Sequence, residues 1–151
     1  MQKIKIDQGD WVVVCDGQKA LILENVGDWK FPNLQTREVF EQANPPTREQ
    51  GSDAPGRSIQ SVGTARSAME QTDWHAKAER DFLADLAGRL DAAISAGDTS
   101  SLVMVAPPRA LGIIRHAYSA HVREALRGEV DKDFVKMPVH EIEQHLTGAL
   151  K

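Results

Sequence analysis

The order of apolar and polar residues predicts a β-rich first third of the chain. Residues 11–16 (WVVVCD) form an almost continuous apolar run, which is typical of a strand buried on both faces of a sheet. Asp16-Gly17 then predicts a tight hairpin whose two central residues have positive φ, and residues 19–26 supply the partner strand. Residues 34–41 alternate weakly and contain β-forming residues, so we expect a third strand and an antiparallel meander.

Helical spacing replaces this alternation after residue 72. Asp73 suits the N-cap of a helix, and Gly97 suits its C-terminal stop. The exposed side carries opposite charges at four-residue spacing, in the pairs Lys77–Asp81 and Asp85–Arg89. The apolar face of this predicted helix consists of Ala78, Phe82, Leu86, Leu90 and Ile94.

The last third predicts a strand, a helix, an edge strand and a final helix. Residues 101–106 (SLVMVA) form a short apolar run, and Pro107-Pro108 suits the start of a helix that ends at Gly128. An edge strand is expected at 130–135, followed by a helix from Pro138. The first of these helices would bury Leu111, Ile114, Tyr118, Val122 and Ala125, and the second Val139, Ile142, Leu146 and Leu150.

The predicted element order is therefore β-β-β-α-β-α-β-α. A meander followed by right-handed crossovers gives a mixed five-stranded sheet flanked by helices, an α/β fold. Ribonuclease H-like domains share this order. We expect one domain over residues 1–151, with residues 1–10 as an extended arm.

Regular patterning stops in a predicted long loop from Asn44 to Thr72, where proline and glycine recur and large apolar residues are few. A structureless stretch of this length is uncommon in a compact domain and is usually functional or disordered. Pro55-Gly56 predicts a tight turn that projects Arg57. Two interpretations stay open, a flexible linker or a binding loop, and the candidate binding residues are Asp53, Pro55, Gly56, Arg57 and Arg66.

The composition indicates a globular protein and limits the kinds of partner that we expect. The chain has 151 residues, of which 41% are hydrophobic and 26% charged, and its formal net charge is −4. This charge argues against a protein coated by nucleic acid and leaves a local basic patch as an alternative. No secretory leader and no run long enough to span a membrane is visible, so we expect a cytoplasmic protein without a membrane partner.

The sequence offers little for catalysis, and we predict neither a metal nor a cofactor. Cys15 is the one cysteine, which excludes a disulfide framework, and its apolar surroundings predict an inert buried thiol. A ribonuclease H-type metal site needs clustered carboxylates; Asp16 follows the first strand, but residues 101–106 contain no acid. The histidine pairs are spaced five apart, whereas zinc-binding helices use a spacing of four: His116 and His121, His140 and His145.

One charge pattern suggests a binding surface. If residues 108–127 form one helix, four basic side chains fall on its exposed side and make a basic ridge of Arg109, His116, Arg123 and Arg127. This ridge is either an ordinary solvated helix face or a contact for phosphate oxygens, which the planar guanidinium group of arginine suits.

Several short motifs resemble one bacterial family, the host attachment proteins ("protein required for attachment to host cells"). The resemblance covers essentially the whole chain, and it depends on the order and spacing of the motifs together. They are Gly9-Asp10-Trp11 with Asp16-Gly17, Asp53-x-Pro55-Gly56-Arg57, Asp73-Trp74-His75, Leu102 to Gly112, and Glu129 to Asp133.

That family is similar to the central domain of archaeo-eukaryotic peptide-chain release factors, which implies a ribonuclease H-like arrangement. In release factors, a Gly-Gly-Gln tip on the loop after the third strand enters the peptidyl-transferase centre. The corresponding loop here, Asn44 to Thr72, contains no Gly-Gly-Gln. The resemblance therefore implies a non-enzymatic domain that contacts the ribosome, RNA or a protein partner. The alternatives are indirect support of attachment to host cells and a metal-dependent hydrolase or nuclease.

Overall fold

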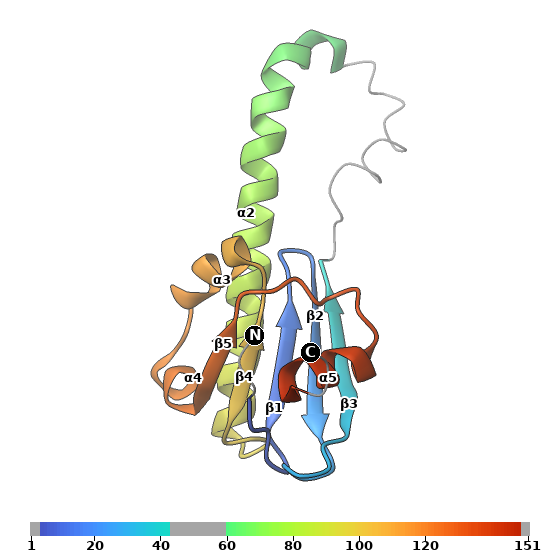
Figure 1. The fold of residues 1–151 in the computed structure, drawn as a ribbon. Coiled ribbons are helices and arrows are strands. Elements are labelled where there is room, and N and C mark those ends of the chain that lie inside the picture. The colour runs from blue at the N-terminus through green and yellow to red at the C-terminus, as the bar shows by residue number, and fades with distance from the viewer. Residues whose placement is uncertain (1–3, 43–59, 149–151) are drawn as a thin grey trace.

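The computed structural model describes residues 4–42 and 60–148, with side chains from residue 74 onward in the second range (Figure 1). The elements in chain order are β1 Trp11–Cys15, β2 Lys19–Asn25, β3 Leu34–Glu41, α2 Gln60–Ser95, β4 Leu102–Val105, α3 Pro108–Arg115, α4 Ala120–Ala125, β5 Leu126–Val130 and α5 Val139–Thr147. The strands form one five-stranded sheet in the order β3-β2-β1-β4-β5.

The sheet is mixed, as predicted. β2 pairs antiparallel with both β1 and β3, whereas β4 pairs parallel with both β1 and β5. Val13 of β1 lies opposite Ile22 on one side and Met104 on the other. This is the order produced by a meander followed by two crossover connections, so the predicted α/β fold class is confirmed.

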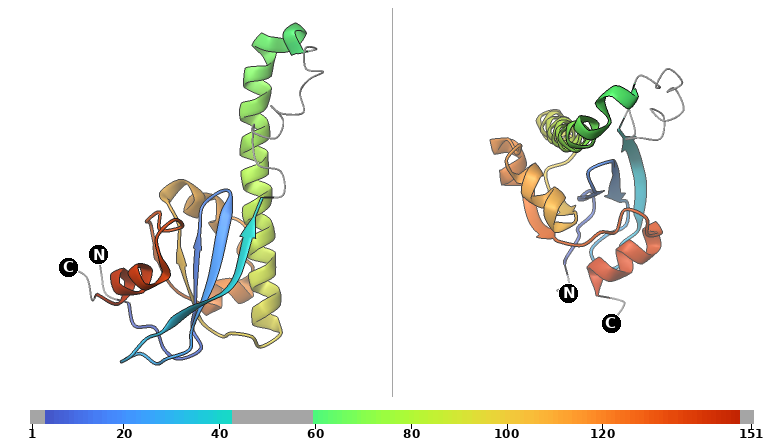
Figure 2. Two further views of the ribbon diagram at one scale, coloured as in Figure 1. Left: turned by 90° about the vertical axis from the view of Figure 1, so that its right-hand side faces the viewer. Right: turned by 90° about the horizontal axis from the view of Figure 1, so that it is seen from above.

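Helices cover both faces of the sheet (Figure 2). α2, α3 and α4 lie on one face, where their apolar side chains pack on alternate strand residues such as Val13 and Met104. α5 and the N-terminal segment lie on the other face, against Val12, Val14 and Val103. The central strands are therefore buried on both sides, which explains why they are almost continuously apolar.

Cys15 is fully buried in the first of these layers, as predicted. Its Sγ atom lies 3.9 Å from the Met104 Sδ atom. Burial, with a smaller effect of the Asp16 charge, raises the pKa of the thiol to about 12. Because the thiolate is the nucleophilic form, Cys15 is an inert core residue.

The β1–β2 hairpin forms where predicted, but its turn is of another kind. Asp16 Oδ1 accepts hydrogen bonds from the backbone N–H groups of Gln18 and Lys19, both at 2.8 Å. Among the described glycines, φ is positive at Gly9, Gly97 and Gly148 but not at Gly17. The expected positive-φ turn was therefore wrong, because the Asp16 carboxylate organises the turn instead.

α2 is longer than predicted, and this corrects the long-loop prediction. The helix begins at Gln60, so residues 60–72 are helical, and Asp73 lies inside the helix instead of capping it. Residues 60–72 contain no proline and several strong helix formers, which explains the earlier start. Residues 43–59 lie outside the described part of the chain.

The end of α2 and its exposed side agree with the prediction. Gly97 has φ of 84°. The Gly97 N–H bonds to the Ile94 carbonyl, and the Asp98 N–H bonds to the Ala93 carbonyl, which is a glycine-terminated Schellman cap. On the exposed side the predicted charge pairs form, with N···O distances of 2.7 Å for Lys77–Asp81 and 3.2 Å for Arg89–Asp85.

The single helix predicted from Pro107-Pro108 to Gly128 is wrong. α3 ends at Arg115, and Ser119 starts α4 by accepting a hydrogen bond from the Val122 N–H on its Oγ atom at 3.2 Å. Gly128 then lies within β5 opposite Val103, so the edge strand is Leu126–Val130 and not 130–135. The predicted apolar stripe is nevertheless buried: Leu111, Ile114, Tyr118, Val122 and Ala125.

The N-terminal segment packs on α5. The Ile4 N–H donates to the Leu146 carbonyl at 2.8 Å, and Ile6 is buried. Ile142 and Leu146 of α5 are buried as predicted, while Leu150 lies outside the described residues. In the described ranges, no helix has both the length and the apolar character required to cross a bilayer.

Candidate functional site

The carboxyl ends of β1 and β4 lie side by side, because these strands are parallel neighbours in the sheet. β1 leads into the Asp16-Gly17 turn, and β4 leads through Pro107 into α3. Ligand sites in open α/β sheets form outside the carboxyl ends of parallel strands. This edge is therefore the first candidate region.

Four residues at this edge hold α2 in place, and we call them the α2 anchor: Gly17, Gln42, Glu79 and Arg109. Arg109 Nε donates a hydrogen bond to Glu79 Oε1 at 2.8 Å, which joins α3 to α2. Glu79 lies so close to the hairpin turn that a Cβ atom on Gly17 would meet its Oε2 atom at 2.1 Å. Gln42 Nε2 donates to the Gly17 carbonyl at 2.7 Å. Gly17 thus contacts both the end of β3 and the middle of α2.

The α2 anchor is suited to positioning rather than to acid–base chemistry. The Glu79 carboxylate is paired with Arg109, and the Asp16 carboxylate is occupied by the backbone of its own turn. Across the residues that the structure describes, no group of three or more His, Cys, Asp or Glu side chains could hold a metal ion. Asp73 is the other acidic residue considered for a nuclease site. The structure describes its backbone within α2 but not its side chain.

Beyond the anchor, α2 extends away from the sheet (Figures 1 and 2). The helix has 36 residues. At 1.5 Å per residue it is about 54 Å long. The end that begins at Gln60 lies away from the body, and the segment 43–59 connects it to β3. The fold therefore sets the end of α2 apart from the rest of the protein.

The predicted loop residues of this region are only partly described. Asp53, Pro55, Gly56 and Arg57 lie outside the described residues. The backbone of Arg66 is helical within α2, and its side chain is outside the description. A binding role for these five residues stays a prediction.

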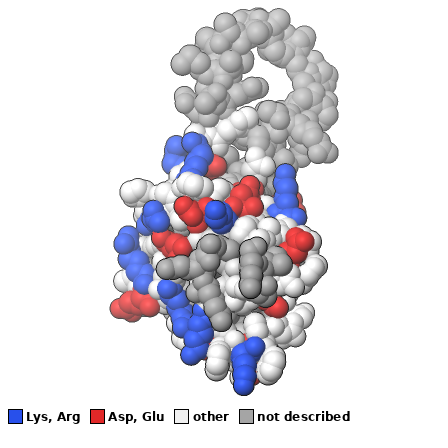
Figure 3. All heavy atoms as spheres, in the orientation of Figure 1, with Lys and Arg blue, Asp and Glu red and all other residues white. Residues whose placement is uncertain are grey.

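The predicted basic ridge does not exist as one helix face. Arg109 is on α3, His116 caps the end of α3, Arg123 is on α4 and Arg127 is in β5. Arg109 is paired with Glu79. Among the residues with described side chains, the only hydrogen-bond partner of the Arg123 side chain is the Arg115 carbonyl, at 3.4 Å. On the face shown in Figure 3, basic and acidic side chains are interspersed. The single helix face that suggested a phosphate contact is therefore absent from α3 and α4. Contact of these residues with phosphate stays a prediction.

Arg127 ties the N-terminal segment to the sheet. Its Nη1 atom donates to Asp7 Oδ2 at 3.1 Å and also to Asp10 Oδ2. Burial alone would lower the pKa of Arg127, but the bonds and charges of Asp10 and Asp7 raise it. Asp10 is only 7% exposed, so this guanidinium group compensates a buried carboxylate.

A second charged cluster, missed by the sequence reasoning, joins α3 to β5. Glu129 accepts hydrogen bonds from Arg115 Nη2 at 2.6 Å and from Tyr118 Oη at 3.0 Å. Burial first, and the Glu129 charge second, raise the pKa of Tyr118. Glu129 stands in one of the motifs noted above, but nothing in its spacing predicts these partners, because they depend on where α3 ends.

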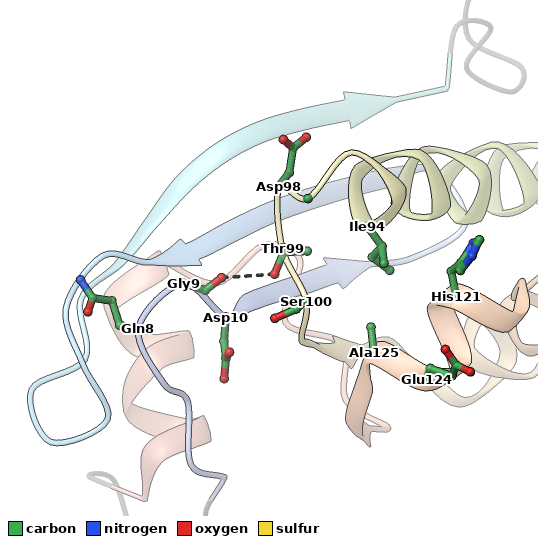
Figure 4. Close-up of a pocket in the computed structure, with 11 residues that line it drawn as sticks. Gln8, Gly9, Asp10, Ile94, Asp98, Thr99, Ser100, His121, Glu124 and Ala125 are labelled. Atoms are coloured by element: carbon green, nitrogen blue, oxygen red, sulfur yellow. Dashed lines mark hydrogen bonds between the residues drawn. The ribbon is translucent and has the colours of Figure 1, made fainter.

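A groove of about 450 Å³ lies at the opposite edge of the sheet (Figure 4). It is bordered by the end of α2, by α4 and by the segments that precede β1 and β4. Thr99 Oγ1 donates to the Gly9 carbonyl at 3.2 Å, and this bond joins two walls of the groove. The polar lining residues are Gln8, Asp10, Asp98, Thr99, Ser100, His121 and Glu124. Their acidic character favours a cationic group over a phosphate.

Beside this groove, Asp91 joins α2 to α4. Its Oδ1 atom accepts from Ser119 Oγ at 2.6 Å and lies 2.9 Å from His121 Nδ1. Serine, histidine and aspartate are the residue types of a hydrolase triad, but here both other side chains bond to the same carboxylate oxygen. The imidazole is therefore not placed to take the serine proton, and the cluster fastens α4 to α2.

A mixed five-stranded sheet with helices on both faces and a long helix projecting after the third strand defines an α/β domain. The chain matches the model of bacterial archaeo-eukaryotic release factor family 12 over residues 10–146. The protein therefore belongs to this family. No curated protein matched the chain.

This match confirms the release-factor part of the resemblance seen in the sequence. It covers all the elements of the sheet and its helices, from the residue before β1 to the last turn of α5. The more specific resemblance to host attachment proteins stays a prediction, as do cytoplasmic location and the ribosomal, RNA or protein partners.

Proposed function

We propose that this protein is a release-factor-like domain that binds the ribosome through the outer end of α2 and the segment 43–59, without catalysing peptide release. Membership of a release-factor family supports the ribosome as the partner. Within the fold, this segment follows the third strand, where release factors carry their tip.

The observation that carries this proposal is the geometry of α2. The helix is fixed to the body by the Glu79–Arg109 pair and by close packing on Gly17, and it then continues well beyond the sheet. An element anchored at one end and free of the body at the other is suited to reaching into a partner. The α2 anchor would set the direction in which the segment is presented.

The non-catalytic part of the proposal comes from the sequence. Peptide release in release factors depends on Gly-Gly-Gln, and the chain contains no such tripeptide. Pro55-Gly56-Arg57 stands in the segment instead. Arginine offers a planar set of donors that suits phosphate oxygens, so we expect Arg57 to contact the RNA backbone.

Co-sedimentation with purified ribosomes tests this proposal. The wild-type protein should sediment with ribosomes at low salt and less at moderate salt, because phosphate contacts are screened. Arg57→Ala should reduce the bound fraction several-fold, whereas Arg80→Ala should not. Arg80 is an exposed arginine of α2 beside the anchor, so it controls for the loss of one positive charge.

Two results would contradict the proposal: no sedimentation of the wild-type protein, or equal losses for Arg57→Ala and Arg80→Ala. A peptidyl-tRNA hydrolysis assay examines the second half of the proposal, and release above the background rate would overturn it. Indirect support of host attachment rests on the sequence resemblance alone, and no contact in the described residues bears on it.

A further inference from the structure

The connection between β2 and β3 exposes an unusual amount of apolar surface. We call residues 26–33 the aromatic loop. Trp29 is 58% exposed, Phe31 is 73% exposed and Val26 is 49% exposed. These are three of the five large apolar side chains exposed in the described ranges. A cluster of this kind marks an interaction site more often than single exposed residues do.

The backbone of the aromatic loop is held firmly by one buried side chain, Asn25. Its Oδ1 atom accepts from the N–H groups of Gly27 at 2.9 Å and Asn33 at 2.8 Å, so it closes both ends of the loop. Its Nδ2 atom donates to the Ile6 carbonyl at 2.9 Å and the Asp28 carbonyl at 3.2 Å. Asn25 is fully buried, so these bonds are protected from water.

The tip of the loop is equally constrained. Asp28 Oδ1 accepts from the N–H groups of Lys30 at 2.9 Å and Phe31 at 2.7 Å. A Cβ atom on Gly27 would lie 2.2 Å from the Phe31 carbonyl oxygen, so the backbone at Gly27 packs too closely against the backbone at Phe31 to admit a side chain. Trp29 and Phe31 are therefore exposed on a preorganised turn, and binding there costs little loop ordering.

Positive charge accompanies the two rings. Lys30 lies between them in sequence, and among the described residues its ammonium group makes no ion pair. Lys5 Nζ lies 5.1 Å from the centre of the Trp29 ring, within cation–π range. The loop lies at the end of the sheet away from the projecting part of α2 (Figure 1).

We infer that the aromatic loop binds unpaired RNA nucleotides, with Trp29 and Phe31 stacking on bases and Lys30 contacting the adjacent phosphate. Exposed flat rings interleaved with lysine are the chemistry of single-strand binding surfaces, because every base has a π face. A lipid surface fits less well, because membrane binding scales with buried apolar area, and the loop exposes only three large apolar side chains. The inference draws on the proposed function only for RNA as the partner class, and it assigns a second contact surface.

Fluorescence anisotropy with a labelled single-stranded oligoadenylate tests the inference on the full chain. The double variant Trp29→Leu/Phe31→Leu keeps apolar side chains but removes the rings, so its affinity should fall about tenfold or more. Trp29→Phe/Phe31→Tyr keeps both rings and should bind like the wild type. Duplex RNA of the same length should bind more weakly than the single strand, because its bases are already stacked.

The inference is overturned if the leucine variant binds oligoadenylate as tightly as the wild type, or if the wild type does not bind. Binding to phosphatidylserine vesicles that the leucine variant retains would assign the loop to a lipid surface instead. Thermal unfolding verifies that each variant is folded. Oligoadenylate binding by Arg57→Ala separates the two proposals: it persists if the aromatic loop acts independently of the end of α2.

Discussion

Two glycines in this protein are constrained by the space around them and not by backbone conformation. Gly17 and Gly27 both have φ outside the left-handed region, yet neither has room for a side chain. At Gly17 the obstacle is the carboxylate of Glu79, and at Gly27 it is a backbone carbonyl. A side chain can move aside where a backbone cannot. The steric clash caused by a substitution could therefore be relieved more easily at Gly17 than at Gly27.

The first prediction concerns Gly17→Ala. The new methyl group should displace Glu79 from Arg109, and we expect a loss of about 1–3 kcal/mol in the free energy of unfolding. In a Glu79→Ala background the same change should cost much less, because the obstructing carboxylate is gone. Urea unfolding of the four proteins in this cycle measures the coupling energy. Additive effects would show that Gly17 and Glu79 do not compete for space.

At the scale of elements, short polar clusters fasten the helices to one another. Glu129 holds α3 to β5 through Arg115 and Tyr118, and Asp91 holds α4 to α2 through Ser119 and His121. α4 has only six residues and could not be stable as an isolated helix. Its place therefore depends on its cap and on the apolar side chains that it buries.

We predict that the Asp91 carboxylate makes the free energy of unfolding depend on pH in the acidic range. Hydrogen bonds from Ser119 and then His121 lower the pKa of this carboxyl from its ordinary value of 3.8. A lowered folded-state pKa gives a stabilising contribution that is present above the unfolded-state pKa and is lost as the pH falls through the folded-state pKa. Urea unfolding between about pH 6 and pH 3 should therefore show a smaller loss of stability for Asp91→Ala than for the wild type.

Asp85→Ala is the matched control, because Asp85 is an exposed acid of the same helix in a surface ion pair. The free energy of unfolding of this variant should change with pH as that of the wild type does. Parallel curves for Asp91→Ala and the wild type would contradict a stabilising role for the ionised Asp91.

The sequence was informative about which residues are buried and less so about where elements end. The stripe Leu111, Ile114, Tyr118, Val122 and Ala125 is buried as predicted, although two helices carry it. Helical periodicity reports only which side faces the core, and α3 and α4 face the same core. The break depends on the cap at Ser119 and on strand pairing of Leu126–Val130, which are tertiary effects.

The sequence located the end of the third strand but not the contacts beside it. The predicted strand ends at Glu41, as β3 does, so the point where the chain leaves the sheet was correct. The α2 anchor could not be predicted, because Gly17, Glu79 and Arg109 lie on three separate elements and meet only through the fold. The basic ridge does not form one helix face, because its residues are divided among α3, its C-cap, α4 and β5. In addition, Arg109 and Arg127 pair with acidic residues far away in the sequence.

The whole molecule combines a compact α/β body with one long projecting helix (Figure 2). The third prediction is that the α2 anchor fixes the angle between them. Spin labels at Gln35→Cys on β3 and Ser67→Cys on α2 should give a narrow distance distribution, and Glu79→Ala should broaden it. Arg80→Ala should not. Cys15 is buried and its pKa is raised to about 12, so it should not take up label.

An unchanged distribution in Glu79→Ala would show that apolar packing alone orients α2. Leu83, Leu86 and Leu90, which are buried on the sheet side of the helix, would then be the orienting residues.

The double contact at Gly17 has a consequence for how such proteins can diversify. The chain leaves the sheet at Gln42 and rejoins the body at Glu79, and both residues touch the same turn. The segment between these two residues is therefore attached to the body at two fixed points. A graft of a release-factor segment bearing Gly-Gly-Gln into this position would therefore begin and end at the native attachment points. The contacts that hold these two points lie in the body, so they do not depend on the sequence of the segment between them.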